Sequence, residues 1–156
     1  MKRVFTLLAI AGVAMVANVT AAQAEIVSNE TVSYSYSGFV PCANGGAGEL
    51  LTGTIDVHNL ITSTVNGNVE SSQFQFQPRG TLVGSITGDA YQLTGVTRGT
   101  SIEGLQSGEH TLTYVNSYQL LGPGAGNNLL VREVAHVISN GDDVVVQHDN
   151  YSIECK

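Results

Sequence analysis

The fold is decided by residues 50–77, which read LLTGTIDVHNLITSTVNGNVESSQFQFQ. Residues 50–64 are rich in side chains that favour β-strands, and residues 69–77 form a second stretch of the same kind. Asn66 and Gly67 lie between them and are typical of a two-residue hairpin turn, because both tolerate a positive φ. This part of the chain therefore predicts two long antiparallel strands joined by a tight turn.

The rest of the chain has the same organisation. Residues 31–37 alternate valine and tyrosine with serine and threonine, which is the period of a strand with one buried face. Nowhere after residue 24 do apolar residues recur at helical spacing over roughly a dozen positions without a glycine. We therefore expect an all-β domain of about eight antiparallel strands, over residues 31–37, 50–64, 69–77, 81–87, 91–102, 110–121, 129–139 and 144–155.

The turns between these strands are short, including one expected at Pro78-Arg79-Gly80, and this favours an up-and-down β-barrel. Sequential hairpins pair each strand with the next, and closing the sheet removes its exposed edges. A β-sandwich built from the same strands is the alternative, but it needs a crossover, and the chain has no obvious crossover segment.

The first 24 residues have the pattern of a secretory signal peptide. Lys2 and Arg3 give a positive start, residues 4–16 are almost wholly apolar, and Ala22-Gln23-Ala24 has the small residues of a cleavage site. The apolar run is shorter than a membrane-spanning helix needs, so we expect no stable membrane insertion. The sequence predicts a bacterial, Sec-type export signal at 1–24, a single β-barrel domain at 25–156, and a secreted or periplasmic location.

The exported part is strongly acidic. After Ala24 there are four basic and thirteen acidic residues, which give a net charge of −9 with neutral histidines. Such a surface repels phosphate backbones, and no basic cluster overcomes this on one face. We therefore expect no nucleic-acid partner.

The chain has two cysteines, Cys42 and Cys155. An oxidising compartment favours a disulfide between them, and the distance along the chain and the lack of a neighbouring histidine pattern make a zinc site unattractive. The alternatives are two free thiols or bonds between molecules. We predict that the two cysteines are bonded.

Several segments resemble a group of small, uncharacterised, secreted bacterial β-barrel proteins. These segments are Thr87-Gly88-x-x-Tyr91, Gly122-Pro123-Gly124-x-Gly126-Asn127-Asn128 followed by His136, and the Asn140-Gly141 hairpin with its closing Cys155. The resemblance implies an exported β-barrel and assigns no activity. In architecture alone, the expected barrel is similar to those of lipocalins and allene oxide cyclases, and this likeness transfers no function.

Candidate binding residues follow from strand parity. His136 shares its parity with Arg132, Val134 and Ile138, so it points inward with Arg132 if the apolar members face the interior. His58 is a further polar candidate on another strand. An inward histidine and arginine could orient a polar ligand or act on it as acid and base, although a histidine paired within a structural network explains the same pattern.

Tyrosines and asparagines complete the candidate set. Tyr114 and Tyr118 share one parity. Inward-facing tyrosines would place hydroxyl groups in the wall of a cavity. Asn127 and Asn128 end a glycine-rich loop that precedes a strand and lacks the lysine of phosphate-binding loops, so we interpret it as a shaped turn at the cavity mouth.

No catalytic signature is present in the sequence. The chain has no nucleophile-elbow serine and no local metal-binding histidine spacing, so we assign no catalytic residue, metal or cofactor. The main hypothesis is an exported, non-enzymatic barrel that binds a small-molecule ligand or an envelope or extracellular protein. An isomerase- or cyclase-like enzyme using the cavity and a structural protein with a filled barrel are the alternatives, and the oligomeric state is left open.

Overall fold

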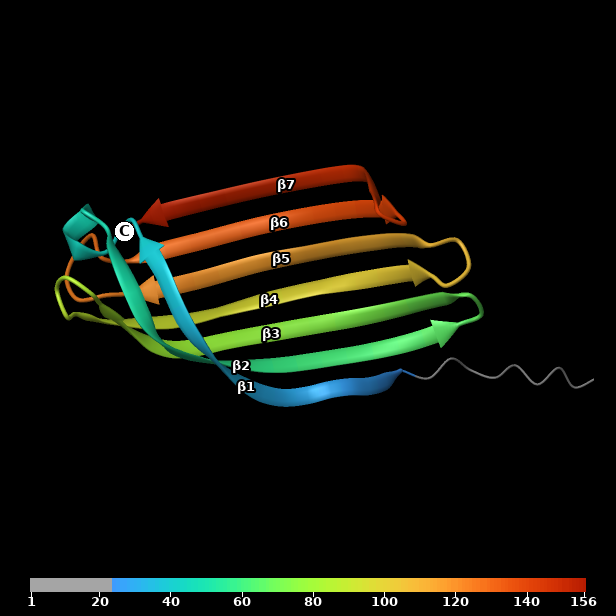
Figure 1. Ribbon diagram of the computed structural model, residues 1–156, viewed down its shortest axis with the longest axis horizontal. Helices are drawn as coiled ribbons and strands as arrows, with labels where there is room; N and C mark the ends of the chain where they lie inside the picture. The colour runs from blue at the N-terminus through green and yellow to red at the C-terminus, as the bar shows by residue number, and fades with distance from the viewer. Residues whose placement is uncertain (1–23) are drawn as a thin grey trace, which may run out of the picture.

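A computed structural model describes residues 24–156 of the chain (Figure 1). The signal peptide expected at 1–24 therefore lies, except for its last residue, outside the described residues. None of the helices within 24–156 is long and apolar enough to cross a membrane. The elements are β1 (Glu25–Val40), the short 3-10 helix η1 (Asn44–Gly46), β2 (Glu49–Asn66), β3 (Val69–Gly84), β4 (Ala90–Gly104), β5 (Glu109–Leu121), β6 (Leu129–Asn140) and β7 (Asp143–Cys155).

The strands form one antiparallel sheet in which each strand pairs with its neighbours in the sequence, in the order β1 to β7. The expected all-β, antiparallel meander is confirmed. The hairpin predicted at Asn66 and Gly67 is also present, because β2 and β3 pair from Asn66↔Val69 onward and Gly67 has a φ of 60°.

Residues 24–156 form seven strands where the sequence suggested about eight, because β3 runs straight through the turn expected at Pro78 and Gly80. Pro78 pairs with Val57 of β2, whereas the ladder between β3 and β4 is interrupted at Gln77 and Pro78. Proline lacks a backbone donor, so it is tolerated where the ladder is already broken. Residues 69–77 and 81–87 therefore belong largely to one strand.

The sheet has two chemically different faces. The inner face contains the buried side chains of Leu51, Leu82, Tyr91 and Leu120, which pack together with Val40 and Ala43 in a small core. The outer face is rich in serine, threonine and glutamine, which alternate with the inner residues along each strand. A single sheet with one apolar face can bury that face only where another segment covers it.

The two ends of the sheet differ, as Figure 1 shows. At the closed end, where β1, β3, β5 and β7 finish, the last part of β1 crosses in front of the sheet toward the start of β6 and the end of β7. At the open end, where these strands begin, β1 and β7 lie at opposite edges. Among the described residues no pairing joins β1 to β7, so the sheet is not closed into a barrel.

Candidate functional site

A groove of about 570 Å³ lies on the inner face, next to the core at the closed end. Its walls are mostly apolar and aromatic side chains from β1 to β6. Representative lining residues are Tyr36, Ile55, Phe76, Leu93, Tyr118 and Val131. The volume and the apolar lining are in the range of sites that bind small molecules.

Two glycines of β4 make room for the aromatic rings on the inner face. A methyl group at Gly95 would overlap the ring of Tyr118, and one at Gly99 would overlap the ring of Phe74. Each ring therefore lies flat across a neighbouring strand instead of filling the space above the sheet. The sequence shows these glycines as interruptions, but it does not show which rings cover them.

A chain of polar side chains begins at the groove wall and leads toward the open end. The hydroxyl groups of Tyr118 and Thr97, which both line the groove, are hydrogen bonded to each other. Tyr118 also lies 3.4 Å from Asn116 Oδ1, and the Asn116 amide donates to Glu133 Oε2. Tyr114 donates its hydroxyl proton to Glu133 Oε1 at 2.8 Å.

The electrostatics of this chain keep Tyr114 protonated. Its hydrogen bond to Glu133 and, as a smaller effect, its burial raise the pKa of Tyr114 above the ordinary value for tyrosine. Both effects disfavour the phenolate, so Tyr114 is a donor to Glu133 at neutral pH. Sequence reasoning identified both tyrosines but missed Glu133, which stands among the apolar residues of β6 without any motif around it.

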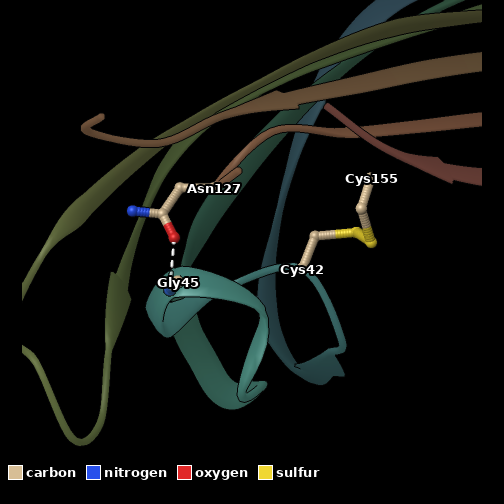
Figure 2. The surroundings of a disulfide bond; sticks show 4 residues. All are labelled: Cys42, Gly45, Asn127 and Cys155. Atoms are coloured by element: carbon tan, nitrogen blue, oxygen red, sulfur yellow. Dashed lines mark hydrogen bonds between the residues drawn. A yellow bond between two sulfur atoms is a disulfide. The ribbon is translucent and has the colours of Figure 1, made fainter. Parts of the chain in front are cut away.

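The closed end is held by a disulfide, which confirms the predicted bond between Cys42 and Cys155. Figure 2 shows this bond beside the loop of residues 41–48, in which Gly45 donates its backbone N–H to Asn127 Oδ1 at 2.6 Å. The Cα atoms of the cysteines are 5.3 Å apart. A disulfide of this kind indicates a non-reducing compartment.

The two asparagines of the glycine-rich loop also take part in this closure. Asn127 is only 9% exposed, and its amide donates to the carbonyl of Pro123. Asn128 accepts from the backbone N–H of Gly122 through its side chain and pairs with Lys156 through its backbone. Both hold the loop and the end of the chain together, and neither lines the groove.

A buried carboxylate supports the same end of the sheet. Glu49, 1% exposed, accepts hydrogen bonds from the backbone N–H groups of Ile86 and Thr87, the Thr87 hydroxyl and the Tyr91 hydroxyl. Tyr91 in turn accepts from the backbone N–H of Asn44, in the loop of residues 41–48 that follows β1, at 3.1 Å.

These bonds set the protonation of Glu49 and Tyr91. Burial raises the pKa of the Glu49 carboxyl, but the hydrogen bonds from residues 86, 87 and 91 together bring it below the ordinary value. Burial and the adjacent Glu49 raise the pKa of Tyr91. Sequence reasoning missed Glu49, although its partners Thr87 and Tyr91 lie in one of the segments that carried the resemblance.

The remaining predicted site residues lie on the outer face, away from the groove. The inner face of β6 consists of the odd-numbered residues, among them Val131 and the buried Ala135, so Arg132 and His136 point to the other side. The condition for an inward His136 and Arg132, that Val134 and Ile138 face the interior, is therefore not met, because apolar residues occur on both faces of this strand. Val134, from that set, is 49% exposed.

The two histidines on the outer face have partners of their own. His136 Nδ1 is 2.7 Å from the hydroxyl of Thr113, and His58 Nε2 is 2.9 Å from Asn29 Oδ1. They lie on β6 and β2, and neither reaches Tyr114 or Tyr118. The two histidines are thus not brought together with the two tyrosines, as the cyclase- or isomerase-like alternative would use them.

Within residues 24–156, no three histidine, cysteine, aspartate or glutamate side chains are grouped so that they could hold a metal ion. Comparison of the chain with protein-family models, curated proteins and solved structures found no match in any of the three. The geometry of the inner face is therefore the basis for a functional proposal.

Proposed function

We propose that this chain is a binding protein for a small apolar molecule, which lies in the groove on the inner face. The observation that carries this proposal is an apolar groove of about 570 Å³ beside a core of only six buried residues. A ligand in the groove would remove apolar surface from water, and the free energy gained is roughly 25 cal/mol per Å² of that surface.

In this proposal the sheet is an incomplete up-and-down barrel. The disulfide holds β7 against the segment after β1 at the closed end, and the rest of the seam between β1 and β7 gives the ligand a way in. The pattern of residues 1–24 and the disulfide support a secreted or periplasmic site of action, as does the resemblance to small exported bacterial proteins.

Titration with the uncharged fluorescent probe N-phenyl-1-naphthylamine tests the proposal. The residues Val131 and Arg132 are adjacent in β6 but face opposite sides of the sheet, so they form a matched pair. Val131→Trp fills the groove and should weaken probe binding by about tenfold or more, equivalent to roughly 1.4 kcal/mol. Arg132→Trp adds the same ring to the outer face and should leave binding unchanged.

Two results would overturn the proposal. One is a lack of probe binding to the wild-type protein. The other is an equal loss of binding in the two variants, since this would place the site outside the groove or show that both rings disturb the fold.

A further inference from the structure

The groove adjoins a carboxylate that has hydrogen-bond donors but no cation. Glu133 lies two residues beyond the groove-lining Val131 on the same face of β6. The side chains of Tyr114 and Asn116 donate to its two oxygens. Each carboxylate oxygen can accept more than one hydrogen bond, so Glu133 has acceptor capacity left.

The arginine side chains lie on the face of the sheet opposite to Glu133. In residues 24–156 the basic side chains are three arginines and Lys156, and the one ion pair joins Lys156 to Glu154 at 3.1 Å. Arg79, Arg98 and Arg132 share the outer face, because they pair across the sheet with residues of the outer parity. The half-buried Glu133 therefore has no lysine or arginine beside it.

A second negative charge lies close to Glu133. Asp149 of β7 pairs with Ala135, the next inner-face residue after Glu133 on β6. The charge of Asp149 also contributes to raising the pKa of Tyr114, which places it in the same neighbourhood. The electrostatic potential at this end of the groove is thus negative. A partly desolvated carboxylate without a counter-ion favours binding of a cation.

We infer that the ligand is a cationic amphiphile, whose apolar body occupies the groove and whose protonated amine binds Glu133 at its rim. This inference rests on the proposed function and adds the chemical class of the ligand. An ammonium group would supply the missing counter-ion and donate to the free lone pairs of the carboxylate. The negative charge of Glu133 would repel a carboxylate or phosphate head group, and no lysine or arginine of residues 24–156 lies beside Glu133 to bind such a group.

Competition between three probes of equal chain length tests the inference. Dodecylamine, dodecanol and dodecanoic acid, each below its solubility limit and any micellar concentration, are used to displace N-phenyl-1-naphthylamine at neutral pH. For the wild-type protein we expect the amine to compete about tenfold better than the alcohol, and the acid to compete worst, in line with the worth of a charge-assisted bond.

Variants of Glu133 then assign the preference to one side chain. Glu133→Gln should bring the ratio of amine to alcohol affinity close to one, and Glu133→Lys should make the acid the better competitor. Glu109→Gln changes an exposed carboxylate on the outer face of β5 and should keep the wild-type ratio. Using a ratio separates the charge effect from a general loss of folded protein, which affects all three probes together.

The outcomes of the two proposals are distinguishable. If amine, alcohol and acid compete equally, or if the ratio is unchanged in Glu133→Gln, the charge inference is wrong while the apolar groove stands. If none of the three displaces the probe, both the groove and the inference fail.

Discussion

The closed and open ends of the sheet are built from the same long strands, but they differ in burial. At the closed end Leu51 is 0% exposed and Leu82 is 1% exposed. Toward the open end the inner-face Val65 is 54% exposed, although it lies on the same strand as Leu51. Strand pairing continues along the whole length, so hydrogen bonding within the sheet does not account for the difference.

The difference comes from the end of β1, which crosses the sheet, and from the loop of residues 41–48 after it, since Val40 and Ala43 both pack in the core. Residues 41–48 cover the inner face at one end only, and they are held there by the disulfide and by hydrogen bonds to Tyr91 and Asn127. A meander provides one layer, and a second layer is needed to bury an apolar face. In this chain the end of β1 and a short loop form that layer, and the uncovered inner face next to them forms the groove.

Removing the disulfide should have the largest effect on the difference between the two ends. Replacing both cysteines, Cys42→Ser with Cys155→Ser, should lower the free energy of unfolding by roughly 4 to 5 kcal/mol, because the bond closes a loop of 113 residues in the unfolded chain. Guanidinium denaturation followed by circular dichroism measures this loss.

Hydrogen exchange supplies the control for the cysteine variant. Exchange should accelerate at residues 41–48 and 122–128, while the β2–β3 turn at the open end keeps its wild-type rate. Uniform acceleration over both ends would contradict a local role for the bond.

Truncating one leucine at each end tests the difference in burial between the two ends. Leu51→Ala removes a fully buried side chain from the closed end and should cost about 2 to 5 kcal/mol. Leu112→Ala truncates a half-buried leucine on the inner face nearer the open end and should cost about 1 kcal/mol, since less surface is returned to water. Equal losses in urea denaturation would show that the two ends are equally packed.

The sequence predicts the local parts of this fold well. Alternation in residues 31–37 and the Asn66-Gly67 turn depend on neighbours in the chain, and both appear as expected. The cysteine pairing was predictable because the chain offers a single intramolecular partner for each thiol. Pro78 was misread as a turn because its tolerance in β3 depends on the ladder to another strand.

The candidate site was less predictable, since it depends on contacts between strands. Tyr118 was expected inside, and the structure places it in the groove wall. An inward His136 was expected only if Val134 and Ile138 face the interior, but Val131 and Val137 on the other parity are apolar too, and it is their side that lines the groove. Glu49 was missed because its four donors come from residues 86, 87 and 91, far along the chain.

The smallest of these effects should be the pH-dependent contribution of Glu49, at the closed end, to the stability of the fold. Glu49→Gln keeps the shape of the side chain but removes a charge, and the amide nitrogen cannot accept the bonds that one carboxylate oxygen now accepts. We expect a lower melting temperature at pH 7, by less than in Leu51→Ala. The wild-type pKa of Glu49 is lower in the folded than in the unfolded chain, so its contribution is present above the unfolded value of about 4.5.

That contribution is lost as the pH falls through the lowered pKa of the folded state. The unfolded chain binds a proton at Glu49 at a higher pH than the folded chain does, so acid favours unfolding. As the pH falls from about 5 through the ordinary range of glutamate, the melting temperature of wild type should fall more steeply than that of Glu49→Gln, because the pKa of Glu49 is lowered in the folded state. Glu109→Gln, exposed and on the outer face, should retain the wild-type slope. Parallel slopes for wild type and Glu49→Gln would show that the carboxylate bound by Thr87 and Tyr91 does not couple folding at the closed end to protonation.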